Sequence, residues 1–196
     1  MLLTIKPSQA RELFESLELF REDKIIPGHF RPCKDSPYGH GYDWIYRYQR
    51  KIAPFLEPRL KAHHTELTCE KGLLYEALTN AFCHAHRKDP LKPITVSIHT
   101  GRIGLLVRVS DCGKGFNVQK VFKHYVKKKR YFSSVGSGIR LMALSPHFSV
   151  FYNQKGTTVN LLYLFDNGLT MFPADLIVAS PESQDGSKEK VSTLSL

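Results

Sequence analysis

The feature that most constrains this chain is a helical stretch, residues 66–87, whose two sides differ in chemistry. At about 100° per residue, one side carries apolar residues that can face a core: Leu74, Leu78, Ala81 and Ala85. The other side carries an acid, an amide and an imidazole at four-residue steps: Glu76, Asn80 and His84. These three residues could form an ordinary solvent-exposed face of the helix. Alternatively, the combination of an acid, an amide and an imidazole could form a functional site. The stretch predicts a core helix that presents candidate site residues.

Four stretches have the alternation of apolar and β-branched residues that is typical of strands. Glycines at the joins predict two hairpins, the first turning near Gly101 and the second near Gly156. The expected strands are residues 94–100, 103–111, 148–154 and 156–165. Each hairpin has a side that can be buried against the helix.

Two further stretches have helical spacing, residues 8–23, with Ser8 as a plausible N-cap, and residues 43–60. Pro54 and Pro58 predict a kink or an early end in the second stretch. The order of elements is helices, two strands, a glycine-rich loop, a short helix and two strands. We therefore expect an α+β fold, a two-layer sandwich in which helices cover one face of a single mixed β-sheet.

The length of 196 residues suits one domain with extensions. We expect residues 1–43 to form an N-terminal helical extension and linker, 44–172 the domain, and 173–196 a polar, disordered tail. No apolar run approaches the roughly 18 residues of a membrane helix. The first residues lack the long apolar stretch of a signal peptide. These patterns predict an intracellular, cytoplasmic protein with no membrane partner.

Two glycine pairs mark a candidate ligand site. Gly113 and Gly115 follow Asp111 at the end of an expected strand, and Gly136 and Gly138 precede an expected helix. Glycines let a backbone turn sharply and approach a ligand closely. A carboxylate can accept a hydrogen bond from an exocyclic amine, and N–H groups at a helix start can bind phosphate. The two pairs together favour a nucleotide, although each alone is common in turns.

The order of the motifs is more specific than any one of them. "EALTNAFCHA", "DCGKGF", "GSGIRLM" and "GTTV" follow one another along the chain. They resemble the N, G1, G2 and last boxes of the GHKL ATPase superfamily, whose nucleotide site is the Bergerat fold. The resemblance covers about residues 44–165. The short segment between G1 and G2, and the end of the chain soon after the last box, are most similar to the stand-alone anti-sigma factor serine kinases.

The resemblance implies ATP and Mg²⁺ as cofactors. Asn80 would coordinate Mg²⁺ through its side-chain oxygen, Glu76 would act as general base, and Asp111 would bind the adenine amino group. Other residues would line the nucleotide: Gly113 and Gly115 at adenine, Gly136 and Gly138 at phosphate, and Thr157 beside Asp111. His84, one turn beyond Asn80, is either a further phosphate contact or an ordinary surface histidine.

Charge is concentrated in one segment. The net charge is +10, and residues 112–165 contain nine basic and no acidic residues. Such a segment favours phosphates or an acidic partner, and a solvated basic face is the simpler alternative.

Tyr125 and Tyr131 lie among these charges and could hold single-stranded nucleic acid. Because the basic charge is already assigned to phosphate binding, nucleic acid is disfavoured as a partner. Cys83, His84 and His86 are close in sequence and could suggest zinc, but they do not share one face of a helix, and no second ligand pair has metal spacing, so zinc is disfavoured.

Two functions are consistent with these motifs. The first is an ATP-binding regulator of the anti-sigma factor serine kinase type, acting as a serine/threonine-protein kinase or ATPase. Its partner would be a protein, a sigma factor or one like an anti-sigma antagonist, and residues 8–23 could support a homodimer. The second is a catalytically weak interaction module in which the nucleotide only switches a binding face.

Overall fold

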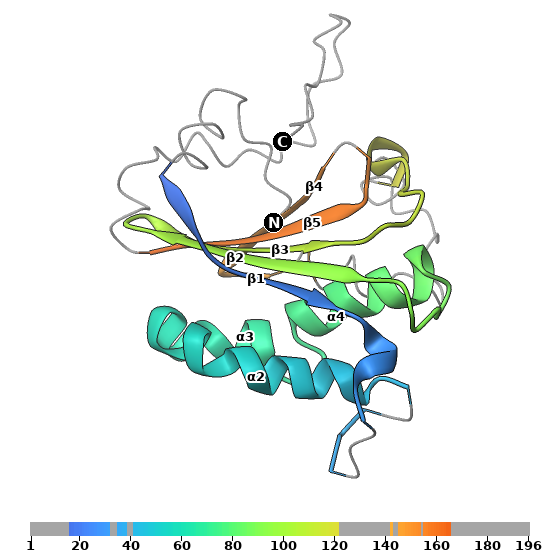
Figure 1. Cartoon of the computed structure of the whole chain (residues 1–196). Coiled ribbons are helices and arrows are strands. Elements are labelled where there is room, and N and C mark those ends of the chain that lie inside the picture. The colour runs from blue at the N-terminus through green and yellow to red at the C-terminus, as the bar shows by residue number, and fades with distance from the viewer. Residues whose placement is uncertain are drawn as a thin grey trace, which may run out of the picture.

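The computed structural model describes residues 16–31, 35–38, 41–121, 142, 145–153 and 155–165. Within these ranges, five strands form one sheet in the order β1-β2-β3-β5-β4 (Figure 1). The strands are β1 Leu17–Ile25, β2 Ile94–Gly101, β3 Gly104–Ser110, β4 Phe148–Tyr152 and β5 Thr158–Leu164. The two hairpins predicted from the sequence are confirmed, since β2 pairs with β3 and β4 pairs with β5.

Helices cover one face of this sheet (Figure 1). They are α2 Asp43–Leu60, α3 His64–Thr68 and α4 Leu73–Thr79, with 3-10 turns at Pro27–His29 and Lys61–His63. A π-helix, Asn80–Ala85, continues directly from α4. None of the helices in the described ranges combines the length and the apolar composition that crossing a bilayer requires.

The core lies between the helices and the sheet. The sheet contributes alternate strand residues to this core, including Val96, Ile98, Val107, Val150 and Leu161, each at most 1% exposed. Helix residues supply the other half, including Ile45, Tyr48, Ile52, Leu56, Leu74 and Leu78, all 0% exposed. Burial of these apolar side chains is the main favourable term in folding. The predicted α+β sandwich with helices on one face is therefore confirmed.

The prediction of a mixed sheet was wrong, because every neighbouring pair in the described sheet is antiparallel. β5 is antiparallel to both β3 and β4. β3 and β4 therefore run in the same direction, as strands joined by a long connection often do. No parallel pair results, since β5 lies between them.

The prediction of a helix over residues 8–23 was wrong where it can be examined. Residues 17–25 form β1, which pairs with β2 from Leu17 opposite Gly101 to Ile25 opposite Ile94. Helix propensity is a weak prior, and the edge of β2 offers a full set of backbone hydrogen bonds that outweighs it. Part of the expected N-terminal helical extension is thus a strand of the main sheet. Residues 8–15 lie outside the described residues.

The predicted helix 66–87 is divided in two. α3 ends at Thr68, and α4 begins at Leu73 after a turn in which Lys71 has φ of 62°. A Cβ on Gly72 would lie 2.8 Å from the Glu66 carbonyl oxygen, so this close turn requires glycine. The expected core side of the second part is confirmed, with Leu74, Leu78 and Ala81 buried.

Pro54 and Pro58 do not end α2 early, which was one of the two alternatives predicted from the sequence, and the helix extends to Leu60. Each proline removes one backbone N–H donor from the helix. Burial of a stripe of apolar side chains against α3, α4 and the sheet offsets this loss. The expected disordered tail, residues 173–196, lies outside the described residues.

Leu78→Ala should lower the free energy of unfolding by about 2–5 kcal/mol, because it removes a fully buried side chain and leaves a cavity between α4 and the sheet. Leu91→Ala is the matched control, since Leu91 is 70% exposed and its loss should change stability by less than about 0.5 kcal/mol. Urea unfolding measures both. Equal effects of the two substitutions would contradict the described core.

Candidate functional site

The candidate site begins on the side of α4 that does not face the core. Glu76 and Asn80 are half-buried there, and His84, one turn later, is exposed. Burial raises the pKa of Glu76 above its ordinary value, because the charged carboxylate loses contact with water. A carboxylate with a raised pKa is a stronger proton acceptor, so Glu76 is suited to act as a base.

The helix changes from α to π geometry at Asn80. The His86 N–H donates to the carbonyl of Ala81, five residues earlier, at 3.0 Å. Single π turns inside helices are frequent at functional sites. The wider turn places Ala85 against the glycine loop after β3, where a Cβ on Gly113 would lie 2.8 Å from the Ala85 Cβ.

Tyr152, at the end of β4, connects the predicted site residues. Burial raises the pKa of its hydroxyl well above the usual range, and a hydrogen bond with the Asn80 side chain opposes this rise. The nearby negative charges of Glu76 and Asp111 raise the pKa further. A single phenol thus interacts with all three polar side chains, which come from a helix and from the end of a strand. The fold therefore brings Glu76, Asn80 and Asp111 together.

The hydrogen bonds of Tyr152 orient the Asn80 amide. The Tyr152 hydroxyl donates to the Met142 Sδ at 3.5 Å. The hydrogen bond with the Asn80 side chain holds this amide beside the phenol.

Asp111 is held at the end of β3 by two backbone contacts. Its N–H donates to the carbonyl of Thr157 at 2.9 Å, and its Oδ1 accepts from the Gly113 N–H at 2.8 Å. Burial raises the pKa of Asp111, and the Gly113 N–H and His86 oppose the rise. Among the described residues Oδ2 accepts no hydrogen bond, so it can accept one from a ligand amine.

The glycine loop packs closely against the turn between β4 and β5. Gly115 has φ of +70°, and a Cβ there would collide with the carbonyl oxygen of Lys155. The N–H of Phe116 donates to the same carbonyl at 3.0 Å. Only glycine satisfies both the backbone angle and the contact at position 115.

Thr157 belongs to this turn and is fixed by Asn153. The Asn153 amide donates to the Thr157 hydroxyl at 3.1 Å and accepts from the Thr157 N–H at 2.9 Å. The contact of Thr157 with Asp111 therefore runs through its backbone carbonyl. This arrangement fixes Asp111 at the end of β3.

His86 and Cys112 form a second layer behind Asp111. His86 is fully buried, and its Nε2 accepts from the Cys112 N–H at 3.2 Å and lies 3.3 Å from the Cys112 Sγ. Burial lowers the pKa of His86, which favours the neutral imidazole that these contacts need. The pair ties the end of the π-helix to the glycine loop.

Two of the predicted residues, Gly136 and Gly138, lie outside the described residues, as does most of the helix expected after them, of which Met142 is described as helical. Three contributors were not predicted from the sequence: Tyr152, His86 and Asn153. Tyr152 follows Phe148 and Val150 at alternate positions, which places it on the helix side of β4. This alternation in the sequence could have identified Tyr152 as a residue that faces the site.

Comparison with protein families places residues 72–163 in the histidine kinase-like ATPase domain. No curated protein matches the sequence. The chain therefore carries a histidine kinase-like ATPase domain of the GHKL type, which confirms the resemblance of its motifs. Domains of this type bind ATP, generally with Mg²⁺.

The described residues fit these groups. The half-buried Asp111 has an oxygen available for an adenine amine. The amide oxygen of Asn80 is a hard ligand of the kind that Mg²⁺ prefers. ATP and Mg²⁺ would therefore lie between the α4–π helix and the loop after β3.

Glu76→Gln should raise the free energy of unfolding at pH 7. The folded-state pKa of Glu76 is raised, so ionisation costs more in the folded than in the unfolded chain, and glutamine removes this cost. Below its ordinary value of 4.5, Glu76 is protonated in both states and the gain should disappear.

Urea unfolding at pH 7 and pH 4 measures this difference. Glu57→Gln, on the exposed side of α2, is the control and should leave stability unchanged at both values. A loss of stability on Glu76→Gln at pH 7 would contradict the description of Glu76 as a carboxylate held in an unfavourable environment.

Proposed function

We propose that this chain is an ATP-dependent serine kinase of the anti-sigma factor type, which binds MgATP and phosphorylates or sequesters a partner protein. The observation that carries the proposal is the convergence of Glu76, Asn80 and Asp111 around Tyr152. The match to the histidine kinase-like ATPase domain supports the nucleotide, and the order and spacing of the motifs support the kinase type.

Each residue has a role in this proposal. MgATP, when bound, supplies a γ-phosphoryl group whose charge the metal partly neutralises. Asn80 holds the metal with its amide oxygen, and Tyr152 keeps that amide in place. Asp111 accepts a hydrogen bond from the adenine amine, which fixes the nucleotide along the pocket. The Gly113 N–H keeps the Asp111 carboxylate oriented for this contact.

Glu76 is the proposed general base. A serine hydroxyl of the partner loses its proton to Glu76 as its oxygen bonds to the γ-phosphorus, and ADP leaves. The raised pKa of Glu76 brings its basicity closer to what proton transfer at neutral pH needs. The proposed partner is a sigma factor or an anti-sigma antagonist-like protein. The basic segment 112–165 favours a partner with an acidic surface.

Phosphate transfer from γ-³²P-ATP to purified anti-sigma antagonist proteins tests the proposal. The parent protein should give phosphoserine on the antagonist, and Glu76→Gln should slow the transfer by a factor of about 10²–10⁴. Glu57→Gln should transfer at the parent rate, because Glu57 lies on α2 away from the site.

Absence of phosphoserine with the parent protein, combined with partner binding that depends on ATP, would instead make the chain a nucleotide-gated interaction module. Transfer that is unaffected by Glu76→Gln would remove Glu76 from its role as base.

A further inference from the structure

The Tyr152 side chain, whose hydroxyl meets the Asn80 amide, is also in contact with the glycine loop after β3. The ring of Phe116, at the end of that loop, meets the Tyr152 ring edge to face, with centroids 5.1 Å apart. This geometry is favourable for an aromatic pair, because the positive edge of one ring lies against the negative face of the other. Tyr152 therefore has one neighbour from the loop and one from the helix.

Backbone contacts fix the position of the Phe116 ring. The Phe116 N–H donates to the Lys155 carbonyl at 3.0 Å, which ties the loop to the turn between β4 and β5. Gly156, in the same turn, has φ of +69°, and a Cβ there would lie 2.9 Å from the Phe116 Cδ1. The missing side chain at position 156 therefore leaves the space that the Phe116 ring occupies. These contacts hold the ring beside Tyr152.

The Tyr152 hydroxyl is held less firmly than its ring. Its donation to the Met142 Sδ, at 3.5 Å, is a weak hydrogen bond, because a thioether sulfur is a poor acceptor. Packing of the ring against Phe116 therefore contributes to where the phenol oxygen lies.

The Phe116–Tyr152 pair connects the two parts of the proposed nucleotide site. The loop that ends at Phe116 begins at Asp111, the residue proposed to bind adenine, whose Oδ1 accepts from the Gly113 N–H at 2.8 Å. Asn80, the proposed metal ligand, lies on the helix and forms a hydrogen bond with Tyr152. A change at Phe116 can thus reach Asn80 through one intervening side chain.

We propose that Phe116 is a positioning residue for Mg²⁺, which holds Tyr152 so that Tyr152 in turn holds the Asn80 amide at the metal. This inference rests on the proposed MgATP site and adds to it a residue that acts only through Tyr152. Residues behind a metal ligand commonly orient it, and their loss weakens metal binding. Without the Phe116 ring, the phenol and the amide beside it would have more positions available.

The nucleotide-free protein allows a spectroscopic test. In ¹⁵N-labelled protein, the Asn80 side-chain amide gives a pair of resonances, identified as the pair that disappears in Asn80→Ala. Phe116→Leu, which keeps an apolar side chain but removes the ring, should shift this pair toward its position in Tyr152→Phe, which lacks the hydroxyl. An unchanged pair in Phe116→Leu would overturn the proposal, and this result does not depend on ATP binding.

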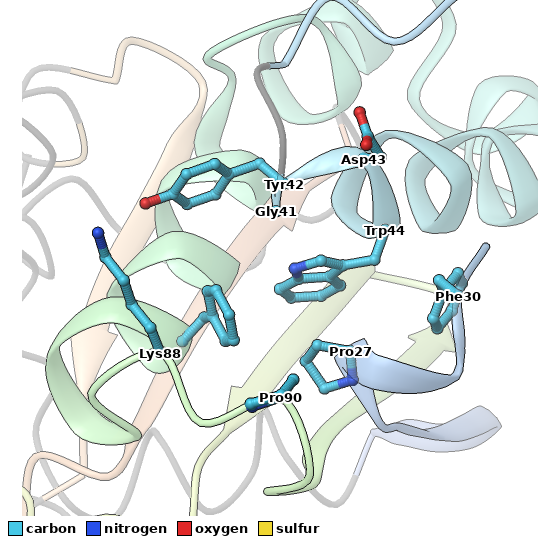
Figure 2. A pocket seen from close by; sticks show the side chains of 9 residues that line it. Pro27, Phe30, Gly41, Tyr42, Asp43, Trp44, Lys88 and Pro90 are labelled. Carbon is cyan, nitrogen blue, oxygen red and sulfur yellow. The ribbon is translucent and has the colours of Figure 1, made fainter. Parts of the chain in front are cut away.

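Phe30→Leu is the matched control. Phe30 is also half-buried and in contact with an aromatic ring, that of Trp44 at 6.5 Å. It lines a cavity whose described lining residues include none of the predicted site residues (Figure 2). Phe30→Leu should therefore leave the Asn80 resonances unchanged. Equal shifts from the two substitutions would overturn the assigned role of Phe116.

Calorimetric titration with ATP measures the effect on the metal. The parent should bind ATP more tightly with Mg²⁺ than without it. Phe116→Leu should reduce this benefit of Mg²⁺ about two- to tenfold, the usual worth of an aromatic pair, and keep the metal-free affinity. Phe30→Leu should keep both. A parent that binds no ATP would overturn this proposal together with the proposed function, whereas a benefit of Mg²⁺ that Phe116→Leu leaves intact would overturn only the role of Phe116.

Discussion

The packing of one helix against one sheet positions the helix residues of the proposed nucleotide site. Leu74 and Leu78 are fully buried beneath the sheet, and this contact fixes how far α4 can rotate. Rotation about the helix axis would move Glu76 and Asn80 away from the end of β4, where Tyr152 meets them. The burial of Leu74 and Leu78 therefore fixes the positions of Glu76 and Asn80 on the opposite side of the helix.

The same arrangement places two carboxylates in surroundings that are unfavourable for their charge. Burial raises the pKa values of both Glu76 and Asp111. Groups held this way lower stability in the free protein, and a bound cation or hydrogen-bond donor can recover part of that cost. In the proposed site, MgATP would bring both, a metal toward Asn80 and an amine toward Asp111. Binding of MgATP should therefore raise the free energy of unfolding, because it offsets part of the cost of burying these two carboxylates.

The sandwich, and the grouping of Glu76, Asn80 and Asp111, could be predicted from the sequence because both rest on local patterns. The α4 periodicity, the two hairpins and the Asp111 glycine loop are each contained in one short, continuous stretch of the chain. The errors arose where long-range pairing decided the outcome. Residues 17–25 became a strand because the β2 edge was available, and β5 lies between β3 and β4. Tyr152 and His86 were missed because their partners, Asn80 and Cys112, lie far away in the sequence.

Asn80 and Asp111 should belong to one MgATP site, and calorimetric titration with ATP measures the contribution of each. The parent protein should bind ATP more tightly with Mg²⁺ than without it. Asn80→Ala should lose this benefit of Mg²⁺ and keep the metal-free affinity, whereas Asp111→Asn should weaken binding with and without the metal. If Asn80→Ala bound MgATP as tightly as the parent, Asn80 would not be the metal ligand and the account of the site would be contradicted.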